Sequence, residues 1–112
     1  MIKYLLGAVL LCGSGPALAV ENHTTANDLM AGCRALYDDT GAKLSQERLV
    51  DAAECLGILV AVMRLMTCAA DGVSYAQGAR VLVAYLDARP TRLHERLPDL
   101  AKEALVAAWP CK

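Results

Sequence analysis

The chain has 112 residues, with 11 Lys and Arg against 12 Asp and Glu, so its charge is nearly balanced. It carries no basic patch, which excludes the usual kind of nucleic-acid-binding protein. With no Phe and a single Trp, the core of its one domain is small, and such a domain benefits from cross-links or from association.

The N-terminal segment has the features of a Sec-type signal peptide. Lys3 precedes an apolar stretch from Tyr4 to Leu11, and Ala17-Leu18-Ala19 matches an A-x-A cleavage site. We therefore predict a cleaved signal peptide over residues 1–19 and a periplasmic mature chain that begins at Val20. The apolar stretch is shorter than the ~20 residues that a membrane span requires, so no span is expected in the mature form.

Cys12 raises the alternative of a lipoprotein, because a lipid-modified cysteine also follows an apolar run. Lipoprotein signals require a small residue just before that cysteine, and Leu11 does not fit. Cleavage after Ala19 removes Cys12 and leaves an even number of cysteines, which are Cys33, Cys55, Cys68 and Cys111. In an exported chain of fewer than ~100 residues, this pattern indicates a disulfide framework.

The first two helices are predicted from apolar residues at helical spacing. The first runs over about Thr25–Tyr37 and ends at the turn cluster Asp38–Gly41. Ser45 caps the second, which runs over about Gln46–Thr67. Its first half is amphipathic, with an apolar side made of Leu49, Val50, Ala53 and Leu56.

The second half of this helix is apolar on nearly all sides, with Arg64 as its only charge. Such a helix must be surrounded by partners, either within the domain or across a dimer interface. We expect Arg64 to reach the rim of the helix or to pair with Glu54 or Asp71, although it could also reach an acidic partner.

Two further helices complete an all-α, four-helix domain over residues 20–112. Ser74 and Gln77 form a capping-box pattern at the start of the third helix, which ends before Pro90. A charged connector follows, and Pro98 opens the fourth helix. The expected buried residues are Tyr75, Ala79, Leu82, Val83 and Leu86 in the third helix, and Leu100, Ala104, Leu105 and Ala108 in the fourth.

Four cysteines allow three pairings, and their number alone does not choose between them. If the first two helices form an antiparallel hairpin turning near Lys43, Cys33 and Cys55 lie equally far from the turn and face each other. The fourth helix then returns Cys111 to Cys68. We therefore predict the disulfides Cys33–Cys55 and Cys68–Cys111.

Enzymatic and metal-binding functions find little support in the sequence. No CxxC and no His pair at ligand spacing is present, so we expect no metal site, no cofactor and no catalytic redox role. Neither His23 nor His94 has a nucleophile nearby, and Ser45 and Ser74 are at capping positions. We predict a protein that is not an enzyme and has no catalytic residues.

The segment from Asn27 to Cys111 resembles the Rap/Tai family of periplasmic immunity proteins associated with type VI secretion. The shared features, in order, are the exported start, Leu29-Met30-Ala31-Gly32-Cys33, Cys55-Leu56-Gly57, Cys68, Gly72-Val73-Ser74-Tyr75-Ala76-Gln77, Val83-Ala84-Tyr85-Leu86 with Pro90, and Ala104-Leu105-Val106-Ala107-Ala108-Trp109-Pro110-Cys111. The last block, an alanine-rich helix ending in aromatic-Pro-Cys, is the most specific.

The chain departs from the family pattern at a few positions. Ile58 and Ala61 replace a Tyr and a Gly, and Ala69-Ala70 replaces a segment that commonly contains Pro. These changes concern helix packing and one loop, and they bear more on the choice of partner than on the fold. The resemblance implies an all-helical, often dimeric protein that binds a peptidoglycan amidase toxin and blocks its active site.

Three segments could contact such a partner: Asp38–Leu44, Asp71–Ser74 and Arg89–Leu97. The acidic pair and the charged connector are the better candidates, which gives Asp38, Asp39, Arg92, His94 and Arg96 as candidate partner-binding residues. Trp109 is favoured as a packing residue over an interface anchor. The alternatives to immunity are a periplasmic stress or chaperone-like protein that binds exposed apolar clients, and a carrier of a small apolar ligand.

Overall fold

A computed structural model describes residues 24–112. The predicted signal peptide and Cys12 lie outside the described residues. The chain folds into four α-helices and one short 3₁₀ helix, which are α1 (Ala26–Ala35), α2 (Gln46–Met66), α3 (Tyr75–Asp87), η1 (Pro90–Arg92) and α4 (Leu97–Ala108). The only β pairing between residues 24 and 112 is an isolated bridge between Thr25 and Arg96. The predicted all-α class is confirmed.

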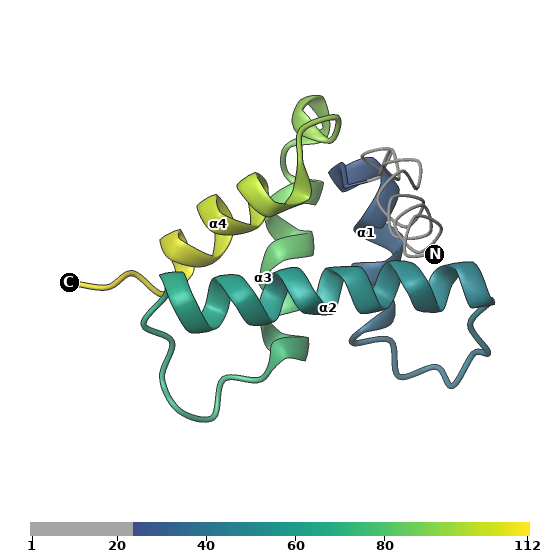
Figure 1. Cartoon of the computed structure of the whole chain (residues 1–112), viewed down its shortest axis with the longest axis horizontal. Helices are drawn as coiled ribbons and strands as arrows, with labels where there is room; N and C mark the ends of the chain where they lie inside the picture. Colours follow the sequence, from purple (N-terminus) through teal and green to yellow (C-terminus); the bar gives the residue numbers. More distant parts are fainter. Residues whose placement is uncertain (1–23) are drawn as a thin grey trace, which may run out of the picture.

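The longest helix, α2, runs across the whole domain, as Figure 1 shows, and α1, α3 and α4 pack on one side of it. In the figure α1 crosses α2 steeply and does not lie along it as in the predicted antiparallel hairpin. Gly32 permits this crossing, because a β-carbon at that position would lie 2.5 Å from the carbonyl carbon of Asp51.

Side-chain caps begin three of the four α-helices. The Thr25 hydroxyl accepts a hydrogen bond from the Asp28 amide, and the Asp28 carboxylate accepts one from the Thr25 amide, which completes a capping box. Ser45 and Ser74 accept hydrogen bonds from amides three residues later, at 3.1 and 3.0 Å, as predicted. Of the predicted capping box at Ser74, the described hydrogen bonds include the one from the Gln77 amide to the Ser74 hydroxyl, but not the reciprocal one from the Ser74 amide to the Gln77 side chain.

Leucines from all four α-helices fill the centre of the domain. The fully buried ones are Leu29, Leu59, Leu82, Leu86, Leu97, Leu100 and Leu105. The predicted inward residues of α3 and α4 are buried with two exceptions. Tyr75 is half-buried, and Ala108 is exposed because it ends α4 beyond the packed turns.

The orientation of α2 about its axis differs from the prediction. The apolar side expected in its first half is exposed at Leu49, Val50, Ala53 and Leu56, whereas its buried side consists of Ala52, Cys55, Leu59, Val62 and Met63. The physical reason lies in the contact with α1. Gly32 lies against Asp51 and Ala52, and Cys55 must face Cys33 to form a disulfide.

Both predicted disulfides are present. Cys33 and Cys55 are linked with their Cα atoms 5.4 Å apart, and Cys68 and Cys111 with theirs 5.0 Å apart. The first joins α1 to α2 near their crossing, and the second joins the end of α2 to the segment after α4. Each closes a loop of the unfolded chain, which in the chain-entropy model stabilises the fold by about 3–4 kcal/mol.

Candidate partner-binding surface

The structure places the candidate partner-binding residues in two separate regions. Asp38 and Asp39 belong to the loop between α1 and α2, whereas Arg92, His94 and Arg96 belong to the connector between α3 and α4. Figure 1 shows this loop and this connector on opposite sides of α2. The five residues therefore cannot form one compact site.

The acidic loop is open to solvent. Asp38 accepts a hydrogen bond from the backbone amide of Thr40 at 3.0 Å, which fixes the start of the turn. The Asp39 side chain is 95% exposed and lies 3.9 Å from the Arg80 guanidinium, a distance at which an exposed pair contributes little. Both carboxylates are available to a cationic partner without loss of internal contacts that hold the fold.

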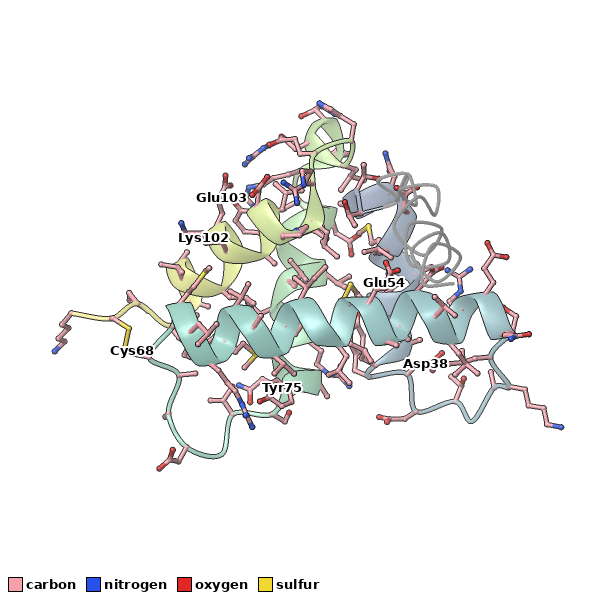
Figure 2. The ribbon with its side chains drawn as sticks, in the orientation of Figure 1. Asp38, Glu54, Cys68, Tyr75, Lys102 and Glu103 are labelled. Atoms are coloured by element: carbon pink, nitrogen blue, oxygen red, sulfur yellow. A yellow bond between two sulfur atoms is a disulfide. The ribbon has the colours of Figure 1, made fainter. Side chains whose placement is uncertain are left out.

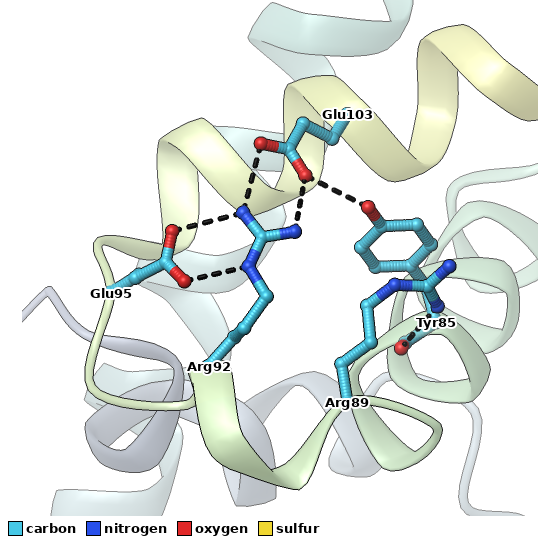
Figure 3. A network of polar contacts seen from close by, with 5 residues as sticks. All are labelled: Tyr85, Arg89, Arg92, Glu95 and Glu103. Carbon is cyan, nitrogen blue, oxygen red and sulfur yellow. Dashed lines mark hydrogen bonds and ion pairs between the residues drawn. The ribbon is translucent and has the colours of Figure 1, made fainter.

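Arg92 is committed to internal contacts, as Figure 3 shows. Its guanidinium donates to both carboxylate oxygens of Glu95, at 2.6 and 2.9 Å, and to both of Glu103, at 2.8 and 3.0 Å. Tyr85 donates its hydroxyl hydrogen to Glu103 at 2.8 Å, and the Arg89 guanidinium lies 3.6 Å from the centroid of the Tyr85 ring. This network joins α3, the connector and α4.

The network shifts the acid–base properties of its members. Hydrogen bonds from Arg92 and then from Tyr85 lower the pKa of Glu103 to about 2. Hydrogen bonding to Arg92 also lowers the pKa of Glu95, and the two carboxylates raise the pKa of Arg92. All three groups are therefore charged at every physiological pH. Arg92 stabilises the connector through these contacts and is not a free contact residue.

His94 and Arg96 lie on the exposed side of the same connector. The connector backbone is fixed to the start of α1, because the Ala26 amide donates to the Glu95 carbonyl at 3.1 Å and the Leu97 amide donates to the Thr24 carbonyl at 2.7 Å. Two exposed, ionisable side chains are thus carried on a rigid segment, which is the arrangement that a binding surface requires.

A shallow depression of about 590 Å³ adjoins the network on the outer side of α3 and α4. It is lined by Tyr85, Asp99, Lys102, Glu103, Val106 and Ala107. Figure 2 shows these Lys102 and Glu103 side chains on α4. Neither Lys102 nor Glu103 is among the residues predicted from the sequence, although their spacing of three and four residues from Asp99 places all three charges on one side of the same helix.

Five large apolar side chains of α2 are exposed, namely Leu49, Val50, Leu56, Leu65 and Met66, and of these Val50 and Leu65 lie on the outer face of the helix, away from its buried side. Leu65 is 80% exposed, and Leu49 and Val50 are each more than half exposed. At the N-terminal end of this face lies an acidic hollow of about 360 Å³, lined by Asp28, Glu47, Val50, Asp51 and Glu54. An apolar face with an acidic border is typical of an interaction surface.

The Arg64 side chain is exposed, as expected for a residue that reaches the rim of the helix, but it does not form the alternative pair with Glu54 or Asp71. Its Nε donates instead to the hydroxyl of Tyr75, at the start of α3, at 2.7 Å. Trp109 is half-buried against the core at the end of α4, in agreement with the predicted packing role.

The described residues contain no arrangement that suggests catalysis. Ser45 and Ser74 serve as helix caps, and His94 is exposed; His23 lies outside the described residues. No three His, Cys, Asp or Glu side chains between residues 24 and 112 are grouped so that they could bind a metal ion. Over the same residues, no helix combines the length and the apolar composition that crossing a membrane requires.

A model of the Rap1a immunity proteins matches residues 25–111, which is nearly the whole described domain. The chain belongs to the Rap1a immunity protein family. No curated protein and no solved structure matches it. Family membership implies that the chain binds a secreted toxin, and the two disulfides are those of an exported protein.

Proposed function

We propose that this chain is a periplasmic immunity protein that binds a type VI secretion peptidoglycan amidase toxin and occludes its active site. The observation that carries the proposal is the family match over residues 25–111. The signal peptide at residues 1–19 and cleavage before Val20 belong to the same proposal, since they would deliver the mature domain to the compartment where such a toxin acts.

The mechanism is tight binding without a chemical step and without a cofactor. Two disulfides and the network around Arg92 hold the domain rigid before it meets its partner. A rigid binder loses little conformational entropy on association, so more of the contact energy is expressed as affinity. Occlusion of a cleft by such a domain excludes the substrate by size alone.

Within this proposal, the toxin contacts the acidic loop through Asp38 and Asp39 and the connector through His94 and Arg96. Arg92 acts indirectly, because its four hydrogen bonds hold the connector in place. The two regions are separate, so they would contact different parts of the toxin or different toxin molecules. Charge reversal at each region tests them independently.

A homodimer is part of the proposal, with the outer face of α2 as its interface. Leu49, Val50 and Leu65 are more than half exposed, and a monomer leaves their apolar surface in water. Sedimentation velocity over a range of concentrations tests this arrangement. The variant Val50→Glu should abolish any dimer, and Lys102→Glu, on another face, is the matched control.

The test of function is binding and inhibition with the exported, oxidised protein and a panel of purified type VI amidase toxins. We expect one toxin to bind at a fixed stoichiometry and to lose peptidoglycan cleavage. The paired variants Asp38→Lys/Asp39→Lys and His94→Glu/Arg96→Glu should weaken that binding, and Lys112→Glu, an exposed residue outside both regions and the depression, is the control. A protein that binds none of the amidases and inhibits none would contradict the proposal.

The exposed apolar face of α2 favours one alternative, a stress or chaperone-like protein that binds many apolar clients. This function predicts broad suppression of client aggregation, strongest at low pH where carboxylates lose their charge. An immunity protein instead binds one partner at a fixed ratio. Aggregation assays with two unrelated client proteins at pH 3 and pH 7 distinguish the two.

A further inference from the structure

The two disulfides lie in opposite environments. Cys33 and Cys55 are both 0% exposed and belong to the central apolar cluster. Cys68 and Cys111 are both exposed, and Figure 2 shows Cys68 at the end of α2 beside the C-terminal segment. A reagent in solution therefore reaches the second pair in the folded protein, but it reaches the first only after α1 and α2 separate.

Contacts other than the disulfide also hold the end of α2 against the end of α4. The Cys68 amide donates to the Trp109 carbonyl at 3.0 Å, and the half-buried Trp109 ring packs on the core. Farther along the two helices, the buried residues Leu59 and Leu105 belong to the same apolar cluster. Opening the Cys68–Cys111 bond removes one of several connections, so it does not require the domain to unfold.

We propose that Cys68–Cys111 is a thiol–disulfide exchange site that a dithiol opens in the folded protein, while Cys33–Cys55 stays closed. The proposal rests on the difference in burial and on the remaining contacts at the end of α2. It does not depend on the immunity function, and it treats this protein as the substrate of exchange and not as an oxidoreductase.

The reaction balances with the dithiol as reductant. One thiolate of the dithiol attacks the Sγ of Cys68 or Cys111, both exposed residues, and forms a mixed disulfide, and the other cysteine leaves as a thiolate. The second thiol of the reagent, as its thiolate, then attacks the reagent's other sulfur, the one bonded to the protein in the mixed disulfide. This closes the ring of the reagent and releases the remaining cysteine. Two electrons pass to the protein, both cysteines end as thiols after protonation, and the dithiol becomes a cyclic disulfide.

The opened state differs from the closed state at one end of the molecule. Residues 110–112 lose their covalent connection to the loop between α2 and α3. That loop, residues 67–74, remains attached through the Cys68–Trp109 backbone hydrogen bond, and the contact of Arg64 with Tyr75 still joins the two helices that flank it. The core around Cys33–Cys55 is unaffected. Reduction therefore loosens a defined surface segment without loss of the fold.

The test is graded reduction of the exported, fully oxidised protein with dithiothreitol under native conditions. Samples are quenched with N-ethylmaleimide, then denatured, fully reduced and labelled with iodoacetamide, and each cysteine is assigned by peptide mass spectrometry. Helical circular dichroism is followed in parallel. We expect Cys68 and Cys111 to acquire the first label at least about tenfold faster than Cys33 and Cys55, with the helical signal retained.

The double variant Cys68→Ser/Cys111→Ser provides an independent check. It should fold with native helix content, and its remaining disulfide should be reduced as slowly as Cys33–Cys55 in the parent protein. Equal labelling rates at all four cysteines would overturn the proposal. Loss of the helical signal in step with labelling of Cys68, or a double variant that does not fold, would overturn it as well.

Discussion

Gly32 of α1 lies directly against the backbone of Asp51 in α2. A β-carbon on Gly32 would lie 2.5 Å from the Asp51 carbonyl carbon and 2.6 Å from the Ala52 nitrogen. Both are backbone atoms, so neither can rotate away as the end of a side chain could. The neighbouring Cys33 is linked to Cys55, which fixes the two helices at this separation. The crossing of α1 and α2 therefore requires the absence of a side chain at position 32.

The variant Gly32→Ala should lower the free energy of unfolding by about 1–3 kcal/mol, because the added methyl group forces the helices apart. The loss should appear although alanine is the better helix former. Gly57→Ala is the matched control, since a β-carbon there meets nothing within 4 Å. It should stabilise the monomer by about 0.5–1 kcal/mol. Guanidinium unfolding of both variants measures the difference, and a Gly32→Ala protein as stable as the parent would count against this crossing.

The same crossing explains what the sequence could and could not predict. Local signals located the helices correctly, because caps such as Ser45 and Ser74 act within a single turn. The disulfide pairing was also predicted correctly, although α1 crosses α2 and does not run antiparallel to it. The inward side of the first half of α2 was predicted wrongly, because the spacing of apolar residues within one helix does not show which side the other helices cover. Its orientation depends on contacts with Gly32 and Cys33, which are distant in sequence.

The sequence likewise predicts part of the candidate partner-binding surface but not all of it. Exposure of Asp38, Asp39, His94 and Arg96 follows from their polar surroundings in sequence. The internal role of Arg92 does not, because it depends on Glu103, eleven residues away, and on the docking of α4 against α3. The partner of Arg64 was missed for the same reason, since Tyr75 is brought close by the turn after α2.

Stability at low pH should depend on the contact between Arg92 and Glu103. The pKa of Glu103 is about 2 in the folded protein, below its ordinary value of 4.5. A carboxyl group with a lowered folded pKa contributes stability that is fully present above the unfolded pKa, and this stability is lost as the pH falls through the folded pKa. The contribution of Glu103 should therefore disappear between about pH 4.5 and pH 2.

Removal of the guanidinium tests this assignment. In Arg92→Met the pKa of Glu103 should rise toward its ordinary value, because only the Tyr85 hydroxyl still donates to the carboxylate. Acid unfolding should then begin at a higher pH. NMR titration of the Glu103 carboxyl carbon measures the pKa directly. Arg96→Met, which changes an arginine of the same connector outside the network, should leave it unchanged, and an equal shift in both variants would argue against the network.

The cap at the start of α3 should contribute measurably to stability. Ser74 accepts the Gln77 amide at 3.0 Å, and Ser74→Ala should cost about 1 kcal/mol, because this amide loses its partner. Ser74→Asp should restore most of the loss, since aspartate accepts the same hydrogen bond at a helix N-terminus. Urea unfolding of the three proteins gives the comparison. If aspartate restored nothing, the loss in the alanine variant would have another cause.

Two leucines of α2 differ in exposure, because one lies on the buried side of the helix and the other on its outer face. Leu59 is fully buried and Leu65 is 80% exposed. Leu59→Ala should cost about 2–5 kcal/mol, because it leaves a cavity in the core, whereas Leu65→Ala should change the stability of the monomer by less than about 0.5 kcal/mol.

Unfolding at low and high protein concentration tests both values. A cost for Leu65→Ala that grows with concentration would place this residue in a dimer interface, since only a dimer is stabilised by mass action. A large cost at every concentration would instead mean that Leu65 is buried within the monomer, which contradicts the orientation of α2.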